Sequence, residues 1–201
     1  MKRASVSGDQ ETPASSSPYS IFRGAYRFVR KCYRQARFSL IYAGKPIKID
    51  PTSWIAHRSV LKAFDGGTIT IGKHCEIHSF AMILANGGPI TIGDNCSVNP
   101  FSIVYGTGGT VIGNGVRIAA HTVIVPANHV PGDDSRPLYR SGTTAKGIAI
   151  DDYVWIGAGC RILDGVRIGR NAVIGAGSVV TQSIPGNCTA VGTPARVIRQ
   201  R

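Results

Sequence analysis

The sequence contains few acidic residues and no long apolar run. Asp and Glu number 11 against 23 Lys and Arg, so the formal net charge is +12 at pH 7. No apolar stretch reaches the roughly 18 residues that a membrane-spanning helix needs, and no apolar core follows Lys2 and Arg3. We therefore expect neither a transmembrane helix nor a signal peptide. A length of 201 residues predicts one domain with appendages.

Cysteine is also sparse, with five residues, an odd number, and no C-x-x-C spacing. This pattern argues against a disulfide framework and favours a reducing compartment. Of the five histidines, no short-spaced pair stands beside a third candidate ligand, so no metal site is expected. The sequence thus predicts a cytoplasmic protein without a metal.

Acidic residues are absent between Thr12 and Ile49. Residues 1–18, rich in Ser, Pro and Thr, are predicted to be a disordered tail. Residues 19–45 predict a basic amphipathic helix, with apolar side chains on one side and arginines on the other. Such a helix could cap the open end of a repeat domain, or lie on an anionic membrane surface. No nucleic-acid-binding motif accompanies the basic residues, and no nucleic acid is expected as a partner.

An aliphatic side chain recurs every six residues through the stretch 149–185. A helix repeats at 3.6 residues and a half-buried strand at 2.0, so a period of six belongs to a supersecondary unit. Hexapeptide repeats are typical of a parallel β-helix, in which three hexads form one coil. The same pattern extends back to residue 49. The repeating aliphatic residues are Ile49, Ile55, Leu61, Ile71, Ile77, Ile83, Ile92, Val98, Val104, Ile112, Ile118, Ile124, Ile150, Ile156, Ile162, Ile168, Ile174 and Val180.

Small residues follow these aliphatics at a fixed offset of four, as Cys160 follows Ile156, and are expected to point inward at the corners of the coil. Glycine pairs 66–67, 87–88 and 108–109 recur once per coil, which predicts a corner with positive φ. The stretch 125–147 keeps no such pattern and must leave the coils. Because loops of this length are usually functional, we expect the chemistry at its base.

Residues 148–201 resemble the hexapeptide-repeat acyltransferases, in particular the maltose and galactoside O-acetyltransferases and bacterial polysaccharide O-acetyltransferases. The resemblance rests on the segments DYVWIGAG, IGAGSVVT and VGTPARVI and covers roughly residues 47–201. It implies an all-β fold: a left-handed parallel β-helix over residues 46–201, with the helical extension at 19–45 and one long excursion loop, 125–147. It also implies a homotrimer with active sites between subunits and acetyl-CoA as the acyl donor.

The resemblance carries roles onto individual positions. His129, in the stretch ANHVP, matches the general base, although a plain loop residue remains the alternative. The backbone amide of Ala158 would meet the thioester carbonyl. The resemblance gives the remaining cofactor contacts as Trp155, Ala176, Thr181, Arg196 and Arg199, with Trp155 equally compatible with corner packing. The candidate acceptor contacts are Asn99, Tyr139 and Arg140.

These residues predict an acetyl-CoA-dependent O-acetyltransferase. A histidine base would deprotonate a saccharide hydroxyl, with no covalent intermediate. The acceptor would be a surface polysaccharide or a lipid-linked glycan precursor at the inner face of the membrane. The alternatives are N-acetylation of an amino sugar, an inactive solenoid scaffold, and a carbonic-anhydrase-like protein of the same fold.

Overall fold

The computed structural model describes residues 42–132, 137 and 140–201, together with Phe22, Tyr26, Val29 and Tyr33. The chain divides into two compact units, Met1–Ala43 and Gly44–Arg201. The expected tail, 1–18, lies outside the described residues. Phe22, Tyr26, Val29 and Tyr33 have helical conformation, but most of the expected helix at 19–45 also lies outside the described residues, so a helical extension is not supported.

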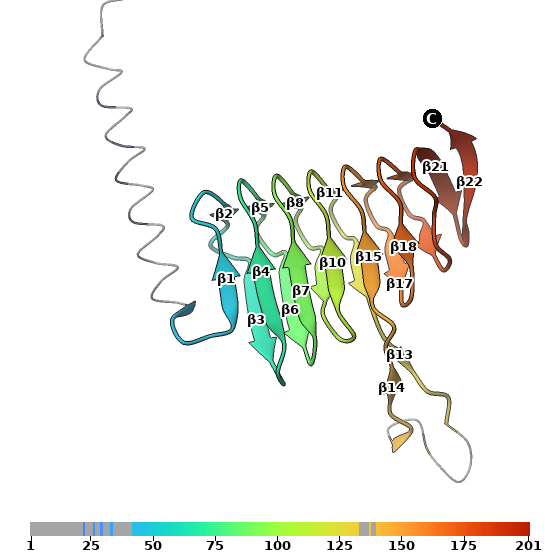
Figure 1. Cartoon of the computed structure of the whole chain (residues 1–201), viewed down its shortest axis with the longest axis horizontal. Helices are drawn as coiled ribbons and strands as arrows, with labels where there is room; N and C mark the ends of the chain where they lie inside the picture. The colour runs from blue at the N-terminus through green and yellow to red at the C-terminus, as the bar shows by residue number, and fades with distance from the viewer. Residues whose placement is uncertain are drawn as a thin grey trace, which may run out of the picture. The chain divides into compact units, whose positions relative to one another are not determined.

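The second unit is a parallel β-solenoid whose strands stack into three sheets, here named A, B and C (Figure 1). Sheet A consists of β1 (Ile47–Ile49), β4 (Thr68–Ile71), β7 (Pro89–Ile92), β10 (Thr110–Ile112), β15 (Ile148–Ile150) and β18 (Arg167–Ile168). Sheet B consists of β2 (Trp54–Ile55), β5 (Glu76–Ile77), β8 (Ser97–Val98), β11 (Arg117–Ile118), β16 (Trp155–Ile156), β19 (Val173–Ile174), β21 (Cys188–Gly192) and β22 (Ala195–Gln200). Sheet C consists of β3 (Val60–Phe64), β6 (Met82–Asn86), β9 (Ile103–Tyr105), β12 (Val123–Val125), β17 (Arg161–Leu163) and β20 (Val179–Val180).

The predicted hexad aliphatics form the core. In sheet A, Ile71 pairs in register with Ile92, and the same alignment continues through Ile112 and Ile150 to Ile168. The hexad residues from Ile55 onward are buried, and Ile49 in the first coil is half-buried. Each side chain therefore packs on its equivalent in the next coil, which confirms the parallel solenoid predicted from the period of six. The stability of such a stack is approximately the sum of coil and neighbour terms.

Each coil turns through three corners, named here by the sheets they join. The B/C corner consists, in successive coils, of residues 56–59, 78–81, 99–102, 119–122, 157–160 and 175–178. At the C/A corner, Gly66, Gly87 and Gly108 have φ values of 80°, 70° and 79°, as the glycine pairs predicted.

Small inward residues that carry a hydroxyl or a thiol donate hydrogen bonds at the corners. Ser102 Oγ donates to Ala119 O at 2.9 Å, and Cys160 Sγ donates to Gly175 O at 3.2 Å, in each case to a carbonyl of the next coil. A short side chain is thus required for space, and a hydroxyl or thiol also satisfies a corner carbonyl that would otherwise be buried without a partner. This second role was not visible in the sequence pattern.

At the A/B corner, glycine is required at position 93 for a steric reason. The backbone N–H of Asp94 donates to Asn114 Oδ1 at 2.8 Å, so the Asn114 side chain reaches up to the preceding coil. A Cβ at Gly93 would lie 2.7 Å from that same oxygen. The sequences Ile92-Gly93-Asp94 and Ile112-Gly113-Asn114 therefore reflect the contact between one coil and the next.

At the C-terminal end, β22 pairs antiparallel with β21 and covers the edge of sheet B at which a further coil would pair. Within the part of the chain that the structure describes, no helix has the length and apolarity needed to cross a membrane.

Candidate functional site

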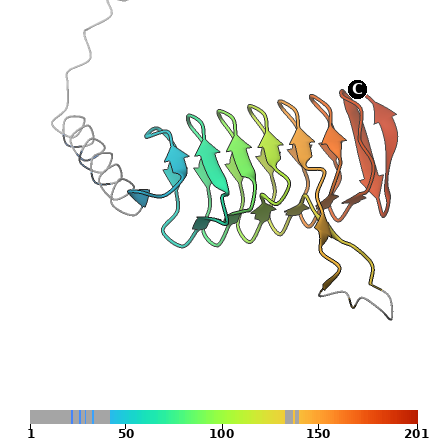
Figure 2. The same ribbon diagram turned by 60° about the horizontal axis from the view of Figure 1, so that its bottom comes forward.

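The chain leaves the coils after β12 and returns at β15. Between them, β13 (Asn128–His129) and β14 (Thr143–Thr144) form a two-stranded antiparallel ladder that projects from the solenoid (Figure 2). The base of this hairpin is held by Asp164, which lies one coil further along. Asp164 Oδ1 accepts hydrogen bonds from the backbone N–H groups of Lys146 at 2.8 Å and Gly147 at 3.0 Å. Its Oδ2 lies 3.5 Å from Asn128 Nδ2.

His129 lies in β13 at the base of the hairpin, with its backbone paired to Thr143, and its side chain is exposed. It lines a cavity of about 330 Å³ together with Asn86, Tyr105 and residues 125–128. The cavity sits at the C/A corner, where β6, β9 and β12 end. An imidazole in this position is accessible to a ligand and is positioned by a backbone ladder on one side and by the coil on the other.

Ala158 and Ala176 lie one above the other at the B/C corner. Ala158 O accepts a hydrogen bond from Gly177 N at 2.8 Å, and both alanines are exposed. The N–H groups of Gly157 and Gly159 donate to Ile174 O and Ala120 O. Among the described residues, none accepts a hydrogen bond from the N–H of Ala158. The N–H of Ala158 is therefore a free donor on a rigid coil, and the N–H of the equivalent Ala176 is a second one among the described residues.

The two groups predicted to act together lie at opposite ends of sheet C within one chain. His129 follows β12 at the C/A corner, whereas Ala158 precedes β17 at the B/C corner. At about 3.3 Å per residue, the strand between these corners separates them by on the order of 15 Å. One chain alone does not bring His129 and Ala158 to the same ligand atom.

The other predicted cofactor residues divide between these regions. Trp155 points outward from β16 and is 57% exposed, between Arg117 and Val173 of the neighbouring strands. Arg196 and Arg199 are exposed on β22, at the far end of the same sheet B. Thr181, also exposed, follows β20 at the C/A corner and is therefore separated from the others.

The predicted acceptor residues are less well gathered. Asn99 is half-buried at the B/C corner, where its Nδ2 donates to Ile118 O at 2.8 Å. Arg140 is exposed in the hairpin, and its backbone N–H donates to Pro137 O. Tyr139 lies outside the described residues.

Reasoning from the sequence missed Asp164 and the cavity residues Asn86 and Tyr105. Asp164 follows β17 in the segment Leu163–Gly165, and another Asp-Gly pair, Asp65-Gly66, stands at the equivalent corner of the first coil, so the residue type did not mark it. Its one signal is that it stands in the first C/A corner after the excursion returns, one coil beyond the C/A corner from which the excursion leaves. Tyr105 and Asn86 have outward positions in strands, and no residue pattern marks such positions as functional.

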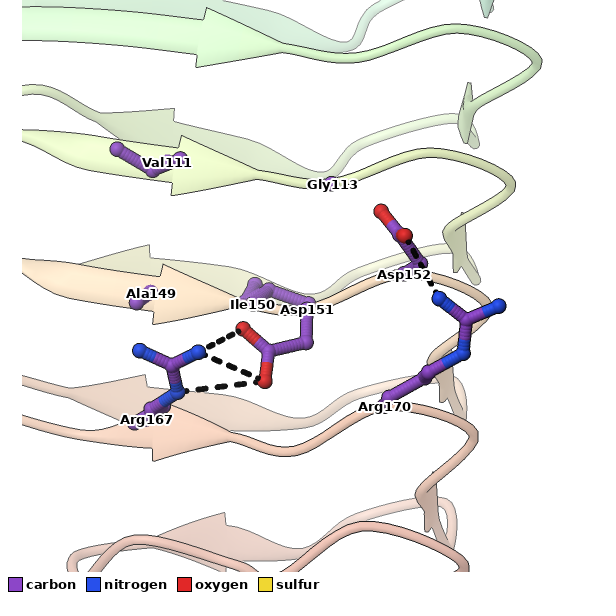
Figure 3. Close-up of a pocket in the computed structure, with 8 residues that line it drawn as sticks. All are labelled: Val111, Gly113, Ala149, Ile150, Asp151, Asp152, Arg167 and Arg170. Atoms are coloured by element: carbon purple, nitrogen blue, oxygen red, sulfur yellow. Dashed lines mark hydrogen bonds and ion pairs between the residues drawn. The ribbon is translucent and has the colours of Figure 1, made fainter.

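Arg167 and Arg170 line two further cavities, one of about 500 Å³ on sheet A (Figure 3) and one of about 530 Å³ at the A/B corner. Arg167 forms an ion pair with Asp151 at 2.9 Å, and Arg170 pairs with Asp152 at 3.1 Å. Arg170 also lies 4.7 Å above the ring of Tyr153. Because each guanidinium is already engaged by a carboxylate of the preceding coil, these pairs brace neighbouring coils.

Groups of three or more His, Cys, Asp or Glu side chains placed to hold a metal ion are absent from the residues that the structure describes.

Comparison with known proteins places this solenoid with transferases. The family described as "Bacterial transferase hexapeptide (six repeats)" matches residues 147–182. The galactoside O-acetyltransferase of Lactococcus lactis is 45% identical over 89 residues, which make up 44% of this chain and 42% of the relative. The chain spans less than half the length of the curated relatives that it matches.

Solved structures cover more of the chain. A hexapeptide-repeat-containing acetyltransferase from Vibrio cholerae is 32% identical, with a TM-score of 0.54, and the match covers 83% of this chain and 80% of that one. AntD, an N-acyltransferase from Bacillus cereus solved as a mutant with dTDP and coenzyme A, is 23% identical with a TM-score of 0.69, covering 81% and 88%. The latter match shows the fold alone. The chain belongs to the hexapeptide-repeat acetyltransferase family.

Proposed function

We propose that this protein is an acetyl-CoA-dependent O-acetyltransferase that transfers an acetyl group to a hydroxyl of a saccharide. In this proposal the solenoid is a left-handed β-helix and assembles as a homotrimer with active sites between subunits. The observation that carries the proposal is the pair of incomplete half-sites at the two ends of sheet C, one with the imidazole of His129 and one with the free N–H of Ala158.

The outer face of sheet C supports the assembly. Side chains alternate inward and outward along a strand, and the outward positions of this sheet are largely apolar. The apolar outward residues are Val60, Phe64, Met82, Leu84, Ile103, Tyr105, Val123, Val125, Leu163 and Val179, and the polar ones are Lys62, Asn86 and Arg161. The outward positions of sheet A, in contrast, include Lys48, Thr70, Thr91 and Arg167 beside the apolar Pro89, Val111 and Ala149. A contiguous apolar face of this kind marks an interaction surface.

In a trimer that buries this face around a common axis, different corners of neighbouring subunits lie against each other. The C/A corner of one subunit then meets the B/C corner of the next, because these corners lie at the two ends of the buried sheet. His129 of one subunit is thereby placed opposite Ala158 of its neighbour. The half-sites are complementary, since one supplies a base and the other a hydrogen-bond donor.

The chemistry follows from these two groups. His129 removes the proton from the acceptor hydroxyl as its oxygen attacks the thioester carbonyl carbon; a positioned general base contributes about 10²- to 10⁴-fold. The N–H of Ala158 stabilises the oxyanion that develops. The carbon–sulfur bond then breaks, and the imidazolium returns its proton to the coenzyme A thiolate. We assign the remaining contacts of the cofactor to Trp155, Ala176, Thr181, Arg196 and Arg199, as in the family.

The acceptor class is inferred from the relative in Lactococcus lactis, whose name specifies a galactoside. Asn99, Tyr139 and Arg140 stay candidates for acceptor contacts. Acetylation at nitrogen is the alternative reaction of the same site. Treatment of the labelled product with mild base separates the two, because it cleaves an ester and leaves an amide intact.

Paired variants test the half-sites. His129→Ala removes the base, and Ala158→Pro removes the N–H while keeping a residue that the corner accepts, since Pro100 occupies the equivalent position two coils earlier. Each variant alone should lower acceptor-dependent thiol release from acetyl-CoA by about 100-fold or more, with an unchanged circular dichroism spectrum.

Co-expression of the two variants should restore part of the activity, because mixed trimers contain sites built from the intact His129 of one subunit and the intact Ala158 of another. Mixed assemblies that remain inactive would contradict the intersubunit site. Wild-type activity in His129→Ala would contradict the role of His129 as base, and a wild-type protein that releases no thiol with any acceptor would favour a scaffold.

We further propose that the N-terminal unit contacts the inner face of an anionic membrane, where a lipid-linked acceptor would lie. Phe22, Tyr26, Val29 and Tyr33 recur at helical spacing and are 64–76% exposed, and the surrounding sequence from 13 to 49 carries basic residues without an acid. The double variant Phe22→Asp, Tyr26→Asp should lose sedimentation with phosphatidylserine vesicles, whereas Tyr153→Asp in the solenoid should not. Equal sedimentation of both variants would contradict the membrane contact.

A further inference from the structure

The third residues of successive B/C corners form a column along the solenoid. Half way along this column the residue type changes from aromatic to glycine. In three successive coils it is aromatic: Phe80, Phe101 and His121, with φ values of 65°, 62° and 61°. The rings stack, with centroids 5.1 Å apart at 3° between Phe80 and Phe101 and 5.1 Å apart at 10° between Phe101 and His121. In the next two coils the same position is glycine, at Gly159 and Gly177.

The glycine half of this column is open. A Cβ at Gly177 would meet nothing within 4 Å, and one at Gly159 would meet only backbone atoms of Gly177 at 4.0 Å. Ala158 and Ala176, the proposed cofactor contacts, stand immediately before these glycines. An extended acyl-carrier arm can therefore run along this half of the corner on the Cβ side of the glycines, beside the Arg161 side chain, whose Nη1 donates to Gly159 O at 2.9 Å.

In the aromatic half of the column the rings fill the space and are partly exposed to solvent. Phe80 is 42% exposed, Phe101 is 51% exposed and His121 is exposed. Arg58 lies 5.5 Å from the centroid of Phe80, at the end of the stack away from the glycines. The other end is the ring of His121, which lies one coil before Gly159 and whose carbonyl oxygen accepts a hydrogen bond from Arg161 Nη1 at 3.0 Å.

Polar groups run beside the rings. Asn99 is half-buried in the column next to Phe101, and its Nδ2 is used by Ile118 O. No described residue donates to Asn99 Oδ1. Binding sites for small polar ligands combine aromatic surface with a few well-placed polar atoms. A sugar ring, with an apolar C–H face and hydroxyl groups at its rim, fits this combination.

We propose that Phe101 and His121 form the wall against which the sugar ring of the acceptor packs, with Asn99 Oδ1 accepting a hydrogen bond from one of its hydroxyls. This inference rests on the proposed function. The acyl carbon, held at Ala158, has the cofactor arm on its glycine side. The acceptor must therefore approach along the aromatic side, where Phe101 and His121 are the first side chains that it meets.

Steady-state kinetics with acetyl-CoA and a panel of methyl galactoside, methyl glucoside and UDP-N-acetylglucosamine tests this wall, using the acceptor that is turned over fastest. Phe101→Ala should raise the KM for that acceptor about fivefold or more and leave the KM for acetyl-CoA within about twofold. Phe101→Tyr, which keeps the ring, should restore the wild-type value. Tyr153→Ala is the matched control, because Tyr153 has φ 59° and is 53% exposed at the A/B corner.

A complementary variant tests whether the glycine half of the column binds the cofactor while the aromatic half binds the acceptor. Gly159→Phe extends the aromatic stack by one coil, in a backbone conformation that Phe101 already adopts. It should raise the KM for acetyl-CoA about tenfold or more and weaken the binding of coenzyme A measured by calorimetry.

If Phe101→Ala and Tyr153→Ala have the same KM for the acceptor, Phe101 and His121 do not form a wall for the sugar ring. Loss of the assembly in Phe101→Ala, seen as a lower mass by light scattering, would also overturn the wall and assign the stack to a subunit contact. Failure of the proposed function looks different: the wild type releases no thiol with any acceptor of the panel, or His129→Ala is fully active, and this inference then fails with it.

Discussion

Asp164 Oδ1 accepts a hydrogen bond from the backbone N–H of Gly147 at 3.0 Å and so ties the returning strand of the excursion to the following coil. Gly147 lies where the excursion rejoins sheet A, and Asp164 lies 17 residues further along the chain. The same oxygen also accepts from Lys146 N at 2.8 Å. One carboxylate therefore fixes the base of the segment that carries His129.

Replacing Asp164 with Ala should reduce turnover more than stability. The N–H groups of Lys146 and Gly147 lose their acceptor, and the hairpin becomes more mobile, so His129 occupies a wider range of positions. Small displacements of a catalytic group lower the reaction rate strongly. We expect kcat to fall about tenfold to 100-fold, with a Tm within about 4 °C of the wild type because the bonds are partly exposed. Asp151→Ala, which breaks an ion pair away from the hairpin, is the control. Equal losses in kcat for both variants would contradict the positioning role.

The hexad core predicts a sharp contrast between two adjacent residues. Ile156 is fully buried and Trp155 is 57% exposed. Ile156→Ala leaves a cavity in the stack and should lower the free energy of unfolding by about 2 to 5 kcal/mol, whereas Trp155→Ala should change it by about 0.5 kcal/mol. Ile156→Asp would bury an unpaired charge and should prevent folding. Chemical denaturation of the purified variants checks these values. Similar losses for Ile156→Ala and Trp155→Ala would contradict the assigned orientation.

Burial raises the pKa of the Cys160 thiol above its ordinary value of 9.0. A group with a raised folded pKa favours the folded state below its unfolded pKa, and this contribution is lost as the pH rises above it. Stability should therefore fall between pH 9 and 10.5 with a component of up to about 1.4 kcal/mol per pH unit from this thiol.

Cys160→Ser should reduce that slope, because a hydroxyl does not titrate in this range and Ser102 occupies the equivalent inward position two coils earlier. Urea denaturation at pH 7, 9 and 10.5 measures the difference. An identical slope in the variant would show that the thiol is not shielded from solvent in the folded state.

The proposed trimer depends on the apolar outer face of sheet C. Ile103→Glu places a charge at the centre of that face, next to Met82 and Val123 in the neighbouring strands. We expect the mass measured by light scattering to fall from three chains to one, with turnover lost and the solenoid fold retained. Thr91→Glu on the exposed face of sheet A should leave the mass unchanged. A trimeric Ile103→Glu variant would contradict this interface.

The sequence alone predicted most of the solenoid, because its period is a local property. The spacing from Ile150 to Ile156 to Ile162 states which side chains point inward before any contact is known, and the small residues between them mark the corners. The interruption at 125–147 likewise indicated where the chain leaves the coils. The assignment of roles to His129 and Ala158 came from resemblance to a family and stays a prediction.

Contacts between coils were decided by the tertiary structure. Coils begin 22, 21, 20 and 38 residues apart, taken from Ile49, Ile71, Ile92, Ile112 and Ile150, so stacked residues have no constant separation in sequence. The stack of Phe101 on His121 and the anchor at Asp164 arise when these unequal coils align in parallel register. The same register gathers the outward residues of sheet C into one apolar face and sets His129 and Ala158 at its two ends. A repeat fixes which way a side chain points, but which distant residue it meets depends on how each insertion is accommodated at its corner.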